Sequence, residues 1–348
     1  MNTHLPSAEN NTINLIADIG GTNIRLAQAT VKAITDSDTI DTPEVDINDI
    51  ETYQCKKFAT LAEVLAHYIE AKQLNAQVIN ACFAIACPVD QDLISMTNLP
   101  WQFSQKELKQ DLQLNSLSFI NDYTAIAMAI PLLSENQKVK IGGGTSVEGK
   151  PISVCGPGTG LGVANLIPLT DAGNGQWQCI SGEGGHIDFA PINEIEQQVK
   201  DFIYKIKKRV SYEQLLSGYG LEQVYQALLF INEAKENITI KDKLSAKDIT
   251  TKALNGTCSI CDKTLTLFCN VLGSFAGNLA LIMNSQGGVY IAGGIVPRFI
   301  DYLQASDFRA RFESKGRLSA ITKQAPTYVI TEEQPGLLGA AAYLYNIG

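Results

Sequence analysis

The chain has 348 residues, of which 45% are hydrophobic and 18% are charged, and its formal net charge is −9. This length predicts about two domains with packed cores, while the acidic balance argues against nucleic acid or an anionic membrane as a partner. The N-terminal stretch MNTHLPSAENNTIN lacks the basic and apolar regions of a secretory signal, so we expect a frayed tail, and no run of 18 apolar residues predicts a membrane span.

Short apolar runs between turn signals predict alternating strands and helices in the first half of the chain. The predicted strands cover residues 14–20, 23–30, 52–59, 78–89 and 116–122, and the predicted helices cover 61–72, 105–112 and 124–132. The segment 33–52 is rich in Asp and Thr and is expected to form an extra loop or an extended hairpin.

The first two strands meet at the sequence LIADIGGTNIR, residues 15–25. Adjacent glycines at a strand end allow positive φ and a close approach of the backbone to another group. That group could be a second strand, which makes the segment a tight hairpin, or a phosphate held by backbone N–H groups. The segment alone does not decide between the two.

The second half of the chain repeats this order of elements. Strands are predicted at 151–156, 163–170 and 176–181, followed by a helical region over about 194–283, a strand at 287–294, a helix at 299–305, a strand at 327–333 and a helix at 337–345. Polar excursions are expected near residue 173 and over 231–250. Helices that alternate with strands pack on a mostly parallel sheet, so the repeat predicts two similar α/β lobes whose glycine turns line a shared cleft.

Two other phosphate-binding motifs are excluded by their context. GTSVEGKP, residues 144–151, has Pro where a Walker loop needs Ser or Thr, and it precedes a strand instead of opening a helix. GPGTGLG, residues 156–162, lacks the G-x-G-x-x-G spacing and leads into a strand, so a dinucleotide fingerprint is not indicated.

Eight cysteines are scattered along the chain. Cys258 and Cys261 form one C-x-x-C, but no second pair and no histidine lie at the spacing of a zinc site. We therefore expect no metal there, and treat the cysteines as thiols that are buried or flank helices.

Three further stretches accompany the two glycine turns DIGGTN and GPGTGLG and complete a set of five motifs. They are FINDYTAIAMAIP (119–131), SGEGGHIDFAP (181–191) and GGVYIAGGIVPRF (287–299). In this order, the set resembles bacterial-type glucokinases, of the hexokinase group in the actin-like ATPase superfamily. The resemblance implies two similar RNase H-like lobes around an interlobe cleft, with residues 1–131 and 332–348 in the small lobe and 132–331 in the large one. No cysteine lies between Ser181 and Lys252, unlike the zinc-binding sugar kinases related to transcriptional repressors.

The resemblance implies ATP-dependent phosphorylation of glucose at its 6-hydroxyl, the first step of glycolysis, by a cytoplasmic homodimer that uses Mg²⁺. Asp122 would be the catalytic base that accepts the hydroxyl proton. Considered alone, Asp122 could equally be the N-cap of the helix that follows it. Two alternatives stay open: a kinase for fructose or mannose, and a catalytically silent sugar sensor.

The resemblance also assigns binding residues. Asp18, Ile19, Gly20, Gly21, Thr22 and Asn23 would form the first phosphate loop, Gly158, Thr159 and Gly160 the second, and Gly293 and Gly294 would contact the adenosine. Asp18 would hold Mg²⁺ through water. The sugar would meet Asn98, Asn121, Asp122, Gly158, Glu183, His186 and Glu213, because carboxylates, amides and imidazole read hydroxyls directionally. Glu213 depends wholly on the resemblance.

Overall fold

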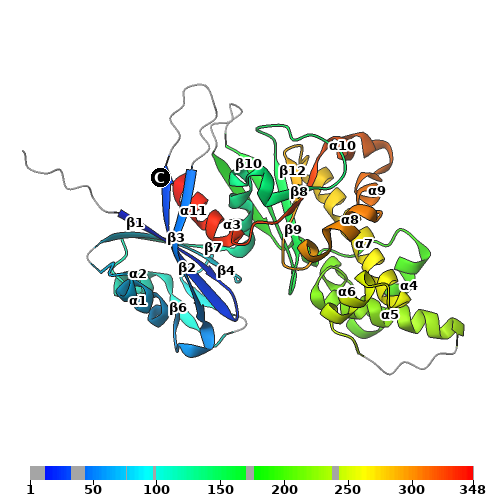
Figure 1. The fold of residues 1–348 in the computed structure, drawn as a ribbon, viewed down its shortest axis with the longest axis horizontal. Helices are drawn as coiled ribbons and strands as arrows, with labels where there is room; N and C mark the ends of the chain where they lie inside the picture. Colours follow the sequence, from blue (N-terminus) through cyan, green and yellow to red (C-terminus); the bar gives the residue numbers. More distant parts are fainter. Residues whose placement is uncertain are drawn as a thin grey trace, which may run out of the picture. The chain divides into compact units, whose positions relative to one another are not determined.

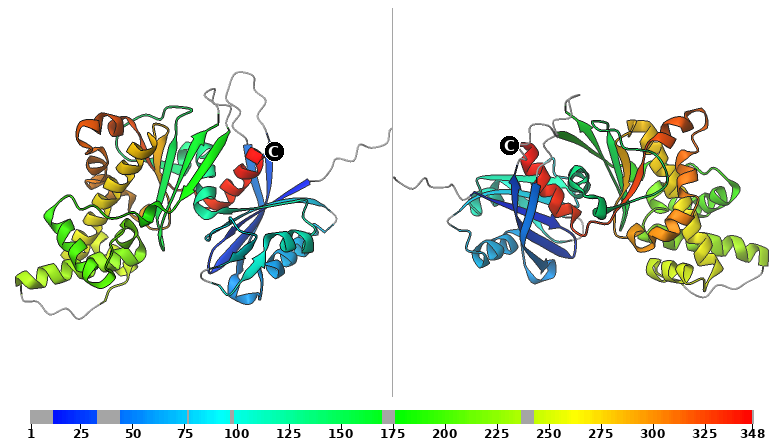
Figure 2. Two further views of the ribbon diagram at one scale, coloured as in Figure 1. Left: turned by 180° about the vertical axis from the view of Figure 1, so that it is seen from behind. Right: turned by 45° about the horizontal axis from the view of Figure 1, so that its top comes forward.

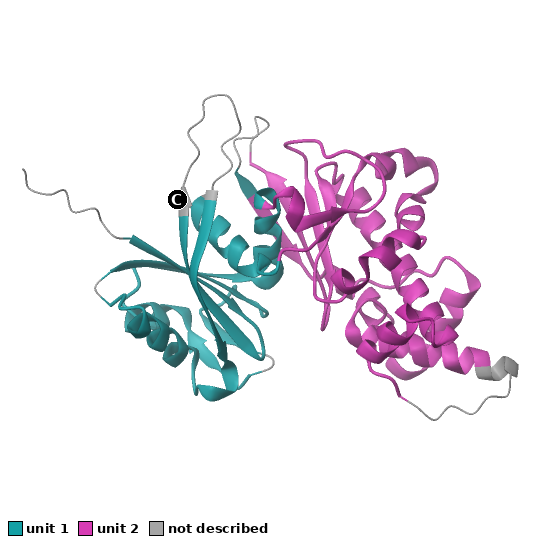
Figure 3. Ribbon diagram, viewed as in Figure 1, with its two compact units in different colours: residues 1–132, 174–177, 333–348 teal, residues 133–173, 178–332 magenta. Residues whose placement is uncertain are grey.

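The computed structural model describes residues 12–32, 44–75, 77–96, 99–169, 176–236 and 243–347. The chain divides into two compact units (Figure 3): unit 1 comprises residues 1–132, 174–177 and 333–348, and unit 2 comprises residues 133–173 and 178–332. Residues 1–11 of the predicted N-terminal tail, the turn near residue 173 and Asn98 lie outside the described residues, as do residues 33–43 and 237–242. Residues 12–14, which were also expected in the tail, belong to the first strand.

Unit 1 is built on a five-stranded sheet with the order β3-β2-β1-β4-β7. The strands are β1 (Thr12–Ile19), β2 (Asn23–Lys32), β3 (Glu44–Gln54), β4 (Val78–Ile85) and β7 (Ser116–Asn121). β1 is antiparallel to β2 and parallel to β4, and β4 is parallel to β7. A short antiparallel pair, β5 (Leu93–Ser95) and β6 (Gln102–Ser104), forms a separate ribbon.

Helices cover both faces of this sheet, which Figure 1 shows with α1 (Leu61–Ala71) and α2 (Gln105–Asp111) on one side and α3 (Asp122–Ala129) and α11 (Pro335–Ile347) on the other. Alternate residues of β1 supply the two cores, because successive side chains of a strand point to opposite faces. Leu15 packs in the core that contains α1, whereas Ile16 packs with residues of α3 and α11. Gly339 lets α11 lie directly on α3, since a Cβ there would lie 1.6 Å from the Ala125 carbonyl oxygen.

Unit 2 contains a six-stranded sheet with the order β11-β10-β9-β12-β13-β8. The strands are β8 (Lys138–Lys140), β9 (Ile152–Pro157), β10 (Leu161–Pro168), β11 (Trp177–Gly182), β12 (Gly288–Ile291) and β13 (Thr327–Ile330). β9 is antiparallel to β10 and parallel to β12, which is parallel to β13. This is the arrangement of β1 with β2, β4 and β7, so the predicted doubling of one α/β unit is confirmed.

Seven helices of unit 2 are described: α4 (Glu194–Lys207), α5 (Gly218–Glu236), α6 (Ala246–Leu254), α7 (Ser259–Met283), α8 (Ile300–Ala305), α9 (Phe308–Glu313) and α10 (Ser319–Gln324). Figure 2 shows α5 and α6 near one end of the yellow α7 and the orange α9 and α10 near the other. In the described part of the chain, α7 is the one helix long and apolar enough to cross a membrane, but 72% of that stretch is buried within the protein. It is a core helix, packed closely against α9 at Gly273 and Gly277.

Several predicted boundaries were wrong. The strand expected at 52–59 is β3, which begins at Glu44 and gives way to a 3-10 turn at Cys55–Lys57. Over residues 44–52, the extended hairpin is the one of the two expected alternatives that the structure confirms. The strand expected at 78–89 ends at Ile85, before Pro88, which cannot donate to a strand ladder. The elements β5, β6, β8, α9 and α10, which have three to six residues each, were not predicted.

Candidate active site

Strand register brings two aspartates of unit 1 to one edge of the sheet. Asp18 on β1 is level with Ala84 on β4, which in turn is level with Ile120 on β7. Asp122 lies two residues beyond Ile120, at the start of α3. Because β1, β4 and β7 are parallel, Asp18 and Asp122 share the carboxyl edge of the sheet, where α/β proteins bind ligands.

Asp122 is the first residue of α3 and not its N-cap. The N-cap is Asn121, whose side-chain oxygen accepts a hydrogen bond from the Tyr123 backbone N–H at 2.9 Å. An Asp122 carboxylate oxygen accepts from the same N–H at 3.0 Å. The interpretation of Asp122 as a helix cap was therefore wrong: Asn121 fills that position, and Asp122 lies in the first turn, where the helix dipole favours an anion.

The two aspartates have unusual acidity. The pKa of Asp122 is raised to about 6, chiefly by burial and in smaller part by the charge of Asp18, while the hydrogen bond from the Tyr123 N–H lowers it. Burial also raises the pKa of Asp18, against the attraction of Arg25, whose guanidinium lies 3.3 Å from the Asp18 carboxylate. A carboxylate with a pKa near 6 is a stronger proton acceptor than an ordinary aspartate and is still ionised at neutral pH.

The first glycine turn closes the β1–β2 hairpin. The Gly20 backbone N–H donates to the Asn23 carbonyl at 3.0 Å, and the Cys55 N–H donates to the Thr22 carbonyl at 2.9 Å. A Cβ at Gly20 would lie 3.3 Å from the Asn23 oxygen, which is tight for any side chain. Ile19 as a whole is 1% exposed, so it is a core residue of unit 1.

Two neighbours of Asp18 were missed by the sequence analysis. Arg25 is the cross-strand partner of Asp18, a position that follows from the register of a hairpin closed at Gly20–Thr22. Gly336, in the first turn of α11, would place a Cβ 3.0 Å from the Asp18 carboxyl carbon. No local signal identifies Gly336, because more than 300 residues separate it from Asp18 in the sequence.

The second glycine turn, in unit 2, lies against Glu213. The Gly158 N–H donates to the Gly160 carbonyl at 2.8 Å, and the Gly218 N–H donates to the Gly158 carbonyl at 2.9 Å. One carboxylate oxygen of Glu213 accepts from the Leu161 N–H at 2.9 Å and lies 2.6 Å from where a Gly160 Cβ would be. Glycine at position 160 is therefore required for this contact.

His186 and Glu183 lie beside the same turn. The other Glu213 carboxylate oxygen is 3.8 Å from His186 Nε2, and the His186 imidazole is 55% exposed. The His186 N–H donates to the Glu183 carbonyl at 3.0 Å in a 3-10 turn, Gly184–His186. A Cβ at Gly185 would lie 2.1 Å from the Leu161 carbonyl oxygen, so glycine lets this turn lie directly on β10.

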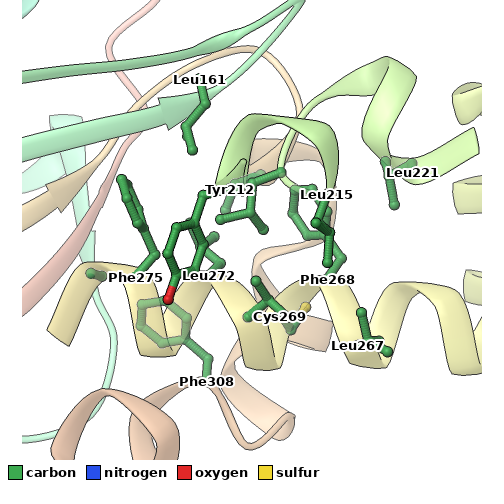
Figure 4. Close-up of a cluster of buried hydrophobic side chains, with 14 of the residues drawn as sticks. Leu161, Tyr212, Leu215, Leu221, Leu267, Phe268, Cys269, Leu272, Phe275 and Phe308 are labelled. Atoms are coloured by element: carbon green, nitrogen blue, oxygen red, sulfur yellow. The ribbon is translucent and has the colours of Figure 1, made fainter. Parts of the chain in front are cut away.

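A buried aromatic cluster holds the segment that carries Glu213 (Figure 4). Glu213 lies in a 3-10 turn, Tyr212–Gln214, whose first residue is 2% exposed. The Tyr212 ring packs against Phe275 of α7, with ring centroids 4.8 Å apart, and against Phe189 at 5.4 Å. Burial of Tyr212 and of Leu215 on either side of Glu213 fixes the backbone there, so the carboxylate is positioned by the core of unit 2.

Gly293 and Gly294 follow β12 in unit 2. Gly293 has φ +85°, and a Cβ there would lie 2.4 Å from the Pro157 carbonyl oxygen at the end of β9. Gly294 has open space around it. In unit 2 the structure thus brings together Gly158, Gly160, Glu183, His186 and Glu213, with Gly293 beside Pro157; in unit 1 it brings together Asp18, Asn121 and Asp122.

Across the described residues, no group of three or more His, Cys, Asp or Glu side chains could hold a metal ion. Mg²⁺, however, keeps several waters and is bound by one or two carboxylates together with substrate phosphates. Asp18, with a partly accessible carboxylate at the sheet edge, fits that kind of site.

Comparisons with known proteins agree with one another. The Glucokinase family model matches residues 15–347. A glucokinase of Colwellia psychrerythraea is 60% identical over 341 residues, which cover 98% of each chain. The crystal structure of a glucokinase from an Antarctic psychrotroph has a TM-score of 0.84 at 37% identity and covers 96% of this chain and 99% of that one. A Balamuthia mandrillaris glucokinase, solved in complex with glucose, shares the fold with a TM-score of 0.72 at 22% identity, covering 97% of this chain and 95% of that one.

Proposed function

The chain belongs to the glucokinase family, and from that premise we propose that Asp122 is the catalytic base of its ATP-dependent phosphorylation of glucose. The observation that carries the proposal is the position of Asp122 at the sheet edge beside Asp18, with a pKa raised to about 6. A base is most effective when its pKa is close to the working pH.

In the proposed step, the glucose 6-oxygen attacks the γ-phosphorus of ATP. The O6–P bond forms, the bond from the γ-phosphorus to the bridging oxygen of ADP breaks, and the hydroxyl proton passes to Asp122. The transition state of such a transfer is loose, so positioning and neutralisation of charge supply most of the catalysis. Asp122 both orients the hydroxyl and receives its proton.

We assign the triphosphate to the two glycine turns, at Gly20–Thr22 and Gly158–Gly160, and the adenosine to Gly293 and Gly294. Backbone N–H groups at such turns suit phosphate oxygens. Asp18 would hold the Mg²⁺ that ATP brings, through water, and that ion would neutralise charge on the β- and γ-phosphates. Asn23 and Thr159 complete the two turns.

The sugar is assigned to Asn121 and Asp122 in unit 1 and to Gly158, Glu183, His186 and Glu213 in unit 2, with Asn98 as a further candidate. Glu213 and His186 lie close enough to contact neighbouring hydroxyls, and each can bond a group that both donates and accepts. Both sets of residues then act on one glucose, with residues 1–131 and 332–348 as one lobe and residues 132–331 as the other.

We further propose that the enzyme is a cytoplasmic homodimer that acts in the first step of glycolysis. The relatives support glucose over the two alternatives, a kinase for fructose or mannose and a silent sugar sensor, because those reported above are glucokinases. ADP release measured with glucose, fructose and mannose at equal concentrations tests this directly, and we expect glucose to be used most efficiently.

Asp122→Asn tests the base role. Asparagine keeps the shape of the side chain and can still bond the Tyr123 N–H, but it cannot take up the proton. We expect kcat to fall by about 10²–10⁴-fold, while glucose binding measured by calorimetry stays within about threefold. Turnover within tenfold of the parent enzyme would remove Asp122 from this role.

Asp111→Asn is the matched control, because Asp111 is an exposed aspartate at the end of α2 in the same unit. It should leave kcat unchanged. Measurement of the stability of Asp122→Asn tests for misfolding. An aspartate whose pKa is higher in the folded than in the unfolded chain destabilises the protein as it ionises, between about pH 4 and pH 6. Removal of this charge at pH 7 should therefore raise the free energy of unfolding by about 1–3 kcal/mol. A raised Tm together with lost turnover is the expected pair of results.

A further inference from the structure

Two cysteines that glucose phosphorylation does not use lie together at the start of α7. Cys258 is the N-cap of this 25-residue helix, and its sulfur accepts a hydrogen bond from the Cys261 backbone N–H at 3.4 Å. The two side chains also influence each other's pKa, lowering that of Cys258 and raising that of Cys261. The C-x-x-C motif of the sequence is thus a pair of neighbouring cysteines in the first turn of a long helix.

The two thiols differ in accessibility. Cys258 is partly exposed, whereas Cys261 is fully buried among the side chains of the unit 2 core. An external reagent can therefore reach Cys258 but not Cys261. Cys261, whose backbone N–H bonds the Cys258 sulfur, is the neighbouring cysteine of any adduct formed on Cys258.

The two thiols also differ in acidity, and the more accessible one, Cys258, is the more acidic. Partial burial by itself raises the pKa of Cys258, but hydrogen bonds from the backbone and side chain of Cys261 and the charge of Lys252 together bring it below its ordinary value. Burial and the hydrogen bond to Cys258 raise the pKa of Cys261 to about 12. Burial likewise raises the pKa of Cys155 and Cys269 to about 12.

We propose that Cys258 and Cys261 form a thiol–disulfide exchange site that accepts a low-molecular-weight disulfide such as oxidised glutathione. The Cys258 thiolate attacks one glutathione sulfur, which forms a mixed disulfide and releases one glutathione thiolate. Cys261 then attacks the Cys258 sulfur, which forms the Cys258–Cys261 disulfide, and the second glutathione leaves as a thiolate that takes up the Cys261 proton. The protein pair is oxidised by two electrons and one glutathione disulfide is reduced to two thiols.

The arrangement favours the internal disulfide as the product. In the reduced protein, the sulfur of the N-cap cysteine lies 3.4 Å from the backbone nitrogen of the cysteine three positions into the helix, and this is the spacing of C-x-x-C redox sites at helix N-termini. Because Cys261 is shielded from solvent, the mixed disulfide on Cys258 is resolved within the chain. A zinc ion is not indicated, since within the described residues no third ligand joins the pair.

The test uses the full-length protein with Cys179→Ser as background, because Cys179 is the other cysteine that is partly exposed. The folded protein is equilibrated with mixtures of reduced and oxidised glutathione, quenched by alkylation and digested with trypsin. Residues 253–263, ALNGTCSICDK, form one tryptic peptide that contains both cysteines and no others. We expect this peptide to lose two hydrogens and to escape alkylation in oxidising mixtures, and to be recovered doubly alkylated after reduction.

Two single variants separate the roles of the thiols. Cys258→Ser keeps a cap on α7, because serine is a preferred N-cap residue, and it should leave Cys261 unmodified. Cys261→Ser should stop the reaction at a glutathione adduct on Cys258, formed at least on the order of tenfold faster than any adduct on Cys261 in Cys258→Ser. The proposal is overturned if the parent peptide stays a dithiol in pure oxidised glutathione, or if Cys261 reacts as fast as Cys258.

Discussion

Asp122 and Glu213 are both acidic residues, but their surroundings differ, and the two carboxylates suit different roles. Asp122 lies at a strand-to-helix junction, where burial and the nearby Asp18 favour its protonated form. Glu213 accepts a hydrogen bond from the Leu161 N–H and lies near the His186 imidazole. The first arrangement makes a proton acceptor with a raised pKa, and the second holds a carboxylate in one orientation, which suits recognition of a hydroxyl.

The raised pKa of Asp122 predicts an acid limb in the pH profile. Asp122 must be ionised to accept a proton, so its active fraction falls as pH drops below about 6. We expect kcat/KM for glucose, which at saturating ATP reports the enzyme that holds nucleotide but not yet glucose, to be level at pH 7–8 and to fall about tenfold per pH unit below about pH 6. Initial rates at saturating ATP, with Tm measured at each pH to exclude acid unfolding, check this. A profile that stays level down to pH 4.5 would show that Asp122 titrates with an ordinary pKa or is not the base.

Glu213 gives a second prediction at the same scale. Glu213→Ala removes a hydroxyl acceptor and leaves the Leu161 N–H without its partner, so we expect KM for glucose to rise by about 10–100-fold while KM for ATP changes by less than about threefold. Glu148→Ala, at an exposed position of the same unit, is the control. An equal rise in both KM values would indicate general damage to the second glycine turn instead of lost sugar recognition.

At the scale of elements, the N-terminus of α11 comes close to the Asp18 carboxylate. Gly336→Ala would place a methyl group 3.0 Å from the Asp18 carboxyl carbon, so Asp18 must shift. We expect KM for MgATP to rise by about tenfold with a smaller change in KM for glucose, because the substitution acts through the proposed magnesium ligand.

Gly143→Ala is the control for this substitution, since a Cβ there would meet nothing within 4 Å and its φ is not positive. Measurement of KM against total Mg²⁺ at fixed ATP separates a shifted Asp18 from a general loss of stability, which Tm reports. Unchanged magnesium dependence in Gly336→Ala would contradict the role given to this contact.

The sequence predicted the elements that carry strong local patterns and missed those that depend on distant contacts. The β1–β2 and β9–β10 hairpins were predicted from apolar strands around glycine turns, whereas Asp122 was singled out by the family resemblance. Arg25 and Gly336 were not predicted as site residues, because their importance depends on contacts that the local sequence does not show. Arg25 pairs with Asp18 across a hairpin, and Gly336 approaches Asp18 from the far end of the chain. Cys258–Cys261 was noticed as a pattern, but its chemistry depends on a helix N-terminus that begins at that residue.

For the whole molecule, the doubled fold explains why each unit carries its own set of candidate residues. Each unit has a central strand that pairs with an antiparallel hairpin partner and a parallel neighbour, and each carries a glycine turn where that hairpin bends. Unit 1 supplies the aspartates and unit 2 supplies the glutamates and the histidine. A duplicated unit can diverge in this way because the residues at its strand ends and turns change without disturbing the core.

A crystal structure of the enzyme with glucose and a non-hydrolysable ATP analogue is the most direct test that one glucose is held by both units. We expect the glucose 6-oxygen to lie about 2.6–3.2 Å from an Asp122 carboxylate oxygen. We expect other glucose hydroxyls to be hydrogen-bonded to Glu183, His186 and Glu213. Glucose held by the unit 2 residues with its 6-hydroxyl beyond reach of Asp122, while the nucleotide occupies both glycine turns, would contradict it.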